Sequence, residues 1–461
     1  MNLTIEQWKE ILNAVNANEG DILGQIKVKL LERYGDIHKG WEQKSFDVNH
    51  IFNVSMTIFG DQFVQEAALL HIAAYSNRKD LVTTLLKNQA KVDAKGNNGF
   101  TALHSAILGK NTEIAEWLIK NGANVKEKFD LKFPGGGFTG ITALHSAIFD
   151  KNTEIAEFLI RNGAKVNEKF DLKSPEGEFI GITALHSAIF DNNTEIAEFL
   201  IRNGANVNEK FDLKCPKGEF TGITALHSAI FDKNTEIAEF LIRNGANVNE
   251  KFDLKCPKGE FTGITTLPLA IFNNDTEIAE FLIKNGANVD EKFDLKCPKG
   301  EFTGITALHL AAQDGELGIV KYLVDKKADV NLKNNDGFTA LDFAEQSDKK
   351  YIVRYLHLCK GKKMFNQKPG EYLEHSLTKA GRDKEITSKA VKVGCVCGVI
   401  AALAVGGGLF AAGIELPILA LIGIAVAAAL VIGVIAGGIT YSVSKKLDEP
   451  DLGDNQHERT C

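Results

Sequence analysis

Apolar positions in this chain follow one pattern that returns through most of its length. In residues 224–250, two stretches with helical spacing predict two short helices, the first after Thr224 and the second at Thr235. Asn234, between them, is predicted to adopt a left-handed backbone conformation, which asparagine tolerates. Gly245 fits the glycine position that follows a helix. The predicted unit is therefore helix, turn, helix and extended segment.

The unit recurs at a fixed spacing. Its central histidine or the equivalent residue returns every 41 residues, at His104, His145, His186, His227, Pro268 and His309. Flanking copies, centred on His71 and Asp342, lie 33 residues from their neighbours. A fixed period in this range indicates small units that stack and bury their apolar faces together.

Three motifs carry a resemblance to a known family. TALH resembles the TPLH of ankyrin repeats, NGANVN resembles their inter-repeat turn, and KNNDGFTALDFA at 333–344 is close to an ordinary family unit. The resemblance implies a mainly α solenoid of about eight units over residues 61–360. It also implies a scaffold that binds proteins, and we find no motif of an enzyme.

The long units differ from the family by 41 − 33 = 8 extra residues, in the segment FDLKCPKGEFTG. Cys215–Gly218 is a turn candidate, so the segment predicts an extended β-hairpin finger, and five such fingers in a row. If Lys214 pairs with Glu219, Leu213 faces Phe220 and Asp212 faces Thr221. Because side chains alternate along a strand, one face of each finger is apolar and the other is polar.

Two interpretations of the apolar face remain open. The faces of successive fingers can pack on each other about 10 Å apart, as stacked sheets do. Alternatively, part of the face forms an exposed groove for a partner. The candidate protein-binding residues combine this face with the polar face and the tips: Phe170, Phe179, Phe211, Leu213, Lys214, Lys217, Glu219, Phe220, Phe252, Lys258, Glu260, Phe261, Lys299 and Phe302.

The repeated histidines and cysteines favour structure over chemistry. Adjacent units stack about 10 Å apart, too far for two histidines to share a zinc ion held at about 2 Å. We therefore interpret the histidines as hydrogen-bonding groups near a helix start and predict no metal. Cys215, Cys256 and Cys297 occupy a permissive turn position. GGGFTG at 135–140 matches a dinucleotide fingerprint only formally, because its sister copies lack it, so no cofactor is predicted.

Charge and the N-terminal residues refine this picture. The net charge of −7, without a basic segment, argues against a nucleic-acid partner. Residues 1–60 have a helical pattern that begins with a capping box of Thr4 and Gln7. We interpret them as a helical N-terminal cap, with a separate docking module as the alternative.

The C-terminal residues change character. After a basic linker at 361–390, residues 391–443 contain two apolar halves of about 24 residues each, long enough to cross a hydrocarbon core of ~30 Å. They predict a transmembrane hairpin, followed by a polar tail at 444–461. Basic residues flank the hairpin on both outer sides and are absent from its turn, so both termini are expected in the cytoplasm.

This organisation predicts a membrane-anchored interaction scaffold. It is similar to ankyrin-repeat proteins of intracellular bacteria, which implies a candidate effector that binds host proteins at a bacterial or host-cell membrane. The alternative is a pore or channel subunit, because glycines at small-xxx-small spacing in the hairpin also favour oligomerisation.

Overall fold

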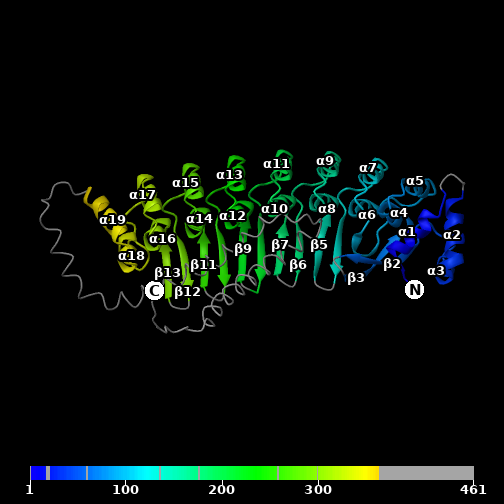
Figure 1. Ribbon diagram of the computed structural model, residues 1–461, viewed down its shortest axis with the longest axis horizontal. Helices are drawn as coiled ribbons and strands as arrows, with labels where there is room; N and C mark the ends of the chain where they lie inside the picture. Colours follow the sequence, from blue (N-terminus) through cyan, green and yellow to red (C-terminus); the bar gives the residue numbers. More distant parts are fainter. Residues whose placement is uncertain are drawn as a thin grey trace, which may run out of the picture.

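The computed structural model describes residues 2–16, 21–58, 61–133, 136–174, 177–216, 218–256, 259–297 and 300–362. They form an elongated array in which helices stack above a row of strands (Figure 1). The predicted linker beyond residue 362, the hairpin at 391–443 and the tail at 444–461 lie outside the described residues.

The N-terminal part combines helices with a small sheet. It contains β1 (Leu3–Thr4), α1 (Ile5–Asn13), α2 (Ile22–Arg33), α3 (Gly35–Glu42), β2 (Ile51–Ile58) and β3 (Asp61–Ala68). The predicted capping box of α1 is confirmed: the Thr4 hydroxyl accepts from the Gln7 N–H at 3.2 Å, and the Gln7 side chain accepts from the Thr4 N–H at 2.9 Å. The β2–β3 hairpin was not predicted from the helical pattern.

The described residues contain eight helix pairs. The first helices are α4 (Leu69–Tyr75), α6 (Ala102–Leu108), α8 (Ala143–Phe149), α10 (Ala184–Phe190), α12 (Ala225–Phe231), α14 (Thr266–Phe272), α16 (Ala307–Asp314) and α18 (Ala340–Gln346). The second helices are α5 (Lys79–Lys87), α7 (Thr112–Lys120), α9 (Thr153–Arg161), α11 (Thr194–Arg202), α13 (Thr235–Arg243), α15 (Thr276–Lys284), α17 (Leu317–Asp325) and α19 (Lys350–Lys362).

The turn between the two helices differs from the prediction by one residue. Asn234 has φ −88° and caps α13, because its side-chain oxygen accepts from the Ile237 N–H at 3.0 Å. Lys233 takes the left-handed conformation instead, with φ 54°. A capping oxygen at Asn234 satisfies an otherwise unpaired N–H of the helix start. Gly245, with φ 90°, ends α13 as predicted.

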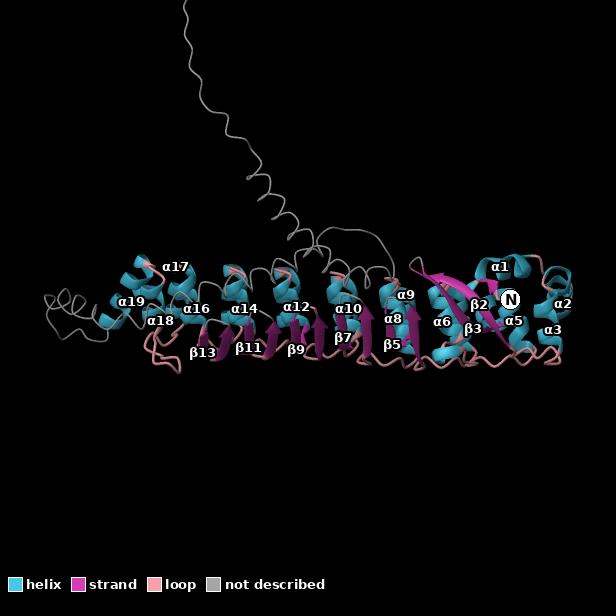
Figure 2. Cartoon of the chain, turned by 90° about the horizontal axis from the view of Figure 1, so that it is seen from below, coloured by secondary structure: helices cyan, strands magenta, loops and turns pink. Residues whose placement is uncertain are grey.

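The five fingers form one antiparallel sheet of ten strands (Figure 2). The strands are β4 (Lys128–Phe133), β5 (Gly136–Thr142), β6 (Phe170–Ser174), β7 (Gly177–Ile182), β8 (Lys210–Cys215), β9 (Gly218–Thr224), β10 (Phe252–Cys256), β11 (Gly259–Ile264), β12 (Phe293–Cys297) and β13 (Gly300–Ile305). The expectation that finger faces stack on each other is wrong: fingers pair edge to edge. Two strands at about 4.8 Å match a helix spacing of 8–10 Å, so each hairpin meets the next.

Each finger contains a bulge at its base. Lys214 pairs with Glu219 and Leu213 with Phe220, as predicted, but the register then shifts. Gly222, with φ 78°, supplies the extra residue, and its N–H donates to the Asp212 carboxylate at 2.8 Å. The same bond recurs in all five fingers, at Gly140, Gly181, Gly263 and Gly304. The bulge removes Asp212 from its predicted place opposite Thr221.

Candidate interaction surface

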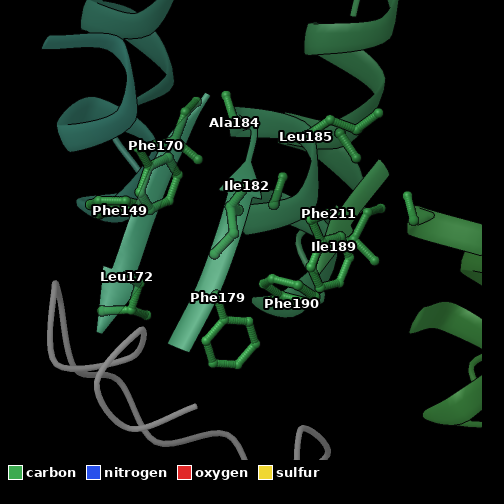
Figure 3. Packing of buried hydrophobic residues seen from close by; sticks show 14 of the residues in the cluster. Phe149, Phe170, Leu172, Phe179, Ile182, Ala184, Leu185, Ile189, Phe190 and Phe211 are labelled. Carbon is green, nitrogen blue, oxygen red and sulfur yellow. The ribbon is translucent and has the colours of Figure 1, made fainter. Parts of the chain in front are cut away.

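The apolar half of the predicted site lies in the core. Phe179 contacts Phe190, the last residue of α10, with ring centroids 6.1 Å apart (Figure 3). In the next finger, Phe220 contacts Phe231, the last residue of α12, with ring centroids 5.9 Å apart. Leu213 is half-buried. The predicted phenylalanines are all at most 8% exposed: Phe170, Phe179, Phe211, Phe220, Phe252, Phe261 and Phe302. In this structure they join sheet and helices and leave little exposed apolar surface.

The opposite face of the sheet carries a row of alternating charges. Glu219 pairs across the sheet with Lys214 in its own finger and with Lys255 in the next. Lys214 Nζ lies 3.3 Å from Glu219 Oε1, and the two side chains are 52% and 48% exposed. Glu260 continues the row. Of the predicted polar residues, Lys214, Glu219 and Glu260 therefore come together, whereas Lys217, Lys258 and Lys299 lie outside the described residues.

A second row of ion pairs connects successive units near the base of the sheet. Lys169 Nζ lies 2.9 Å from Glu209 Oε2, and Lys210 Nζ lies 2.8 Å from Glu250 Oε2. The hydrogen bond from Lys210 is the main cause that holds the pKa of Glu250 below its usual value. The sequence analysis missed these pairs. Their signal is a lysine followed 40 residues later by a glutamate in successive units.

Most of the repeat histidines bond through both ring nitrogens, and Nε2 then reaches a backbone carbonyl of the next unit, as in His71, His145, His186, His227 and His309. In His104 the bonds are both at Nδ1, with the N–H and the hydroxyl of Thr101. The Thr183 N–H donates to His186 Nδ1 at 3.1 Å. Nδ1 is therefore unprotonated, and Nε2 carries the hydrogen that it donates to the Glu209 carbonyl at 3.1 Å. Burial lowers the pKa of His186 to about 4, although the carbonyl opposes this shift. The prediction of a structural role near the helix start is confirmed.

Comparison with known proteins agrees with this geometry. A family model described as ankyrin repeats (3 copies) matches residues 49–129, 70–170, 127–211, 171–252, 209–293 and 267–367, well over half of the chain. The chain belongs to the ankyrin-repeat family. The comparison with curated proteins found no match.

The ankyrin units also contain buried carboxyl groups that the sequence analysis missed. Asp150, Asp191 and Asp232 follow the first helices of three successive units. Burial raises the pKa of Asp150 and of Asp191 to about 6, opposed by Lys110 and Lys151, and it raises the pKa of Asp232 to about 8. The position preceding Asp150 and Asp191 by 40 residues is lysine, whereas Asn192 stands 40 residues before Asp232. The environment of Asp232 therefore differs in the missing cation, and its carboxyl is also the most deeply buried of the three.

In the next ankyrin unit a neutral side chain, Asn273, occupies the position of Asp232. Asn273 is buried, and its side-chain N–H donates to the Ile230 carbonyl at 2.6 Å. The side chain of Asp150 is 3% exposed, and neither of its oxygens accepts a hydrogen bond. The position therefore favours a donor over a carboxylate.

The remaining candidate chemistry is sparse. Cys215 and Cys256 are free and half-buried at equivalent positions of neighbouring fingers. Within the part of the chain that the structure describes, no group of three histidine, cysteine or acidic residues could hold a metal ion. Among those same residues, no helix is long and apolar enough to cross a membrane.

Proposed function

We propose that this ankyrin-repeat protein is a protein-binding scaffold held at a membrane, and that its partner contacts the polar face and the tips of the finger sheet. The observation that carries this proposal is the alternating row through Lys214, Glu219, Lys255 and Glu260. The first three residues are exposed and Glu260 is half-buried, and the row is regular and built on paired strands. Rigid elements hold such groups more precisely than separate loops would.

The chemistry of this face favours a partner with charges of both signs. Like charges recur on every second strand, roughly 10 Å apart at about 4.8 Å per strand. A partner with the opposite alternation would meet several complementary charges at once, which favours fast and selective association. Exposed pairs such as Lys214 and Glu219 contribute little to folding, so they are available for binding.

The membrane part of the proposal rests on the sequence. The two apolar halves of residues 391–443 have the length of transmembrane helices, and the basic residues on both outer sides favour cytoplasmic termini. The finger sheet would then face cytosolic proteins. The similarity to ankyrin-repeat proteins of intracellular bacteria supports a role as an effector whose partner is a host protein.

The test compares two charge-reversed forms of the full chain. A partner is first captured by crosslinking and identified, and its affinity is measured with purified protein. Lys214→Glu together with Lys255→Glu should weaken binding at least roughly tenfold, as expected for the loss of two charge pairs. The matched control, Arg202→Glu with Lys284→Glu, changes the same charge on the second helices and should bind normally. Equal affinity of both variants would refute the polar face as the binding surface.

A further inference from the structure

The row of strands is interrupted between β3 and β4. The units centred on His71 and His104 are 33 residues apart, so the turn between them is short and contains only a 3-10 helix at Asn97–Gly99. β3 is the last strand of the three-stranded sheet, and β4 is the last strand of the ten-stranded sheet. In Figure 1, β3 lies beside the end of the ten-stranded sheet that is nearer to the N-terminal helices, and part of β3 approaches β4 closely. Among the described residues, neither strand pairs with a further strand on its outer edge.

The outer edge of β4 has the same backbone groups that join the other fingers. Phe133 and Gly136 close the β4–β5 hairpin, so the alternate residues Lys132 and Asp130 direct their N–H and C=O groups away from β5. In the later fingers the equivalent residues pair with the preceding finger, as Lys255 does with Glu219. Four such junctions occur in the sheet, and β4 presents a fifth that is unfilled among the described residues.

The short turn packs between the bases of β3 and β4. The Asn97 side chain accepts from the Glu66 N–H of β3 at 3.1 Å. A Cβ on Gly99 would lie 2.5 Å from the Lys128 carbonyl, so the turn also packs against the start of β4. Asp130 and Lys132 lie further along β4, beyond this contact.

We propose that one extended segment of a partner protein pairs with the outer edge of β4, opposite Asp130 and Lys132. The proposal rests on the protein-binding function above and names a different surface for it. Addition of a strand to a sheet edge is a common mode of peptide recognition, in which backbone hydrogen bonds provide affinity. The segment continues an existing sheet, so its register follows from the internal junctions.

The internal junctions also specify the chemistry of the segment. Opposite Lys, Leu and Asp of each finger, the preceding finger places Glu, Phe and Thr at the junction of β9 with β10, and again at that of β11 with β12. Lys132 faces Gly137 in its own hairpin, where the later fingers have glutamate. It therefore lacks the carboxylate that its equivalents have. The partner segment should therefore contain an acidic residue, an apolar residue and a threonine, in that order along its chain.

The test uses the full chain and a labelled peptide, KGEFTGIT, the sequence of residues 258–265, with binding followed by fluorescence polarisation. Lys132→Pro removes an N–H on the outer edge of β4 and leaves the pairing with β5 intact, as edge strands allow. It should weaken binding roughly tenfold or more. The matched control, Glu301→Pro, makes the same change on the outer edge of β13 and should leave binding unchanged.

A charge exchange covers the case in which the proline variant does not fold. Lys132→Glu should weaken binding of KGEFTGIT and strengthen binding of KGKFTGIT, because the pair is reversed. No binding of the first peptide to the unmodified chain, or equal binding of a scrambled peptide, would overturn the proposal. In that case, the proposed function would still hold if the binding of a captured partner requires Lys214 and Lys255.

Discussion

Replacement of Asp232 by asparagine should stabilise the protein, and the gain should grow with pH. Asp232 is shielded from water and has no cation close by, so its pKa rises from 3.8 to about 8. Asn273 occupies the same position in the next unit and donates to a carbonyl of the preceding helix. In the variant, the new amide would donate in the same way to the Ile189 carbonyl.

The sign of the effect follows from the two pKa values. In the unfolded chain the Asp232 carboxyl loses its proton near pH 4, whereas the folded chain holds it until about pH 8. Stability is therefore fully present below pH 4 and declines as the pH rises to 8. Each pH unit in this window corresponds to about 1.4 kcal/mol, which sets an upper limit of roughly 6 kcal/mol. Local relaxation reduces this, and we expect a gain of about 2 kcal/mol in Asp232→Asn at pH 8.5.

Asp150 provides the matched control. Lys110 Nζ lies 3.7 Å from its carboxylate, and its pKa is about 6. The stability gained in Asp150→Asn should therefore level off above pH 6, whereas that of Asp232→Asn continues to rise to pH 8. Urea denaturation followed by circular dichroism at half-unit pH intervals measures both curves. Identical curves for the two variants would refute the reasoning, and Asn192→Lys should shift the behaviour of Asp232 toward that of Asp150.

Three further outcomes are expected. Below pH 6.5 the array should lose stability toward pH 4, because burial depresses the pKa of repeat histidines such as His186 and His227 to about 4, and that of His104 to about 3. His186→Ala should lower the free energy of unfolding by about 2 kcal/mol at pH 7.5 and flatten the loss of stability in acid, and an unchanged loss in acid would contradict this. Gly222→Ala places a Cβ at φ 78° and should cost about 1–2 kcal/mol in urea denaturation, whereas Thr221→Ala on the exposed face should be neutral. In a cysteine-free background, a probe cysteine at Glu415 should react with an impermeant reagent from outside and one at Ser444 should not; labelling of Ser444 would leave only one span.

Much of the fold followed from residue patterns that act locally. Helix starts such as Thr224, the glycine after α13 and the hairpin pairing of Lys214 with Glu219 depend on a few adjacent residues. The joining of fingers did not follow, because alternation along a strand identifies its two faces and says nothing about its edges. Edge pairing depends on the distance between stacked helices, which is a property of the assembled array.

The same limit applies to the candidate site. The polar and apolar sets were separated correctly, but the phenylalanines are buried against helices such as α10, whose last residue, Phe190, was not assigned to contact the finger. The raised pKa of Asp232 could not be predicted either. The sequence FDK at 231–233 is that of an ordinary turn, and only the structure shows that the carboxyl is buried. Long-range packing, rather than local preference, decides both.

The ten-stranded sheet also changes how the array responds to force. In a solenoid without long fingers, each unit contacts only its neighbours, through side chains and turns. Here the backbone hydrogen bonds between fingers run along the array, so pulling its ends apart loads them directly. Ten strands at about 4.8 Å give a stiff span of roughly 45 Å. The units with long fingers should therefore hold groups that bind along the sheet at a fixed separation, and the units on either side should deform more easily.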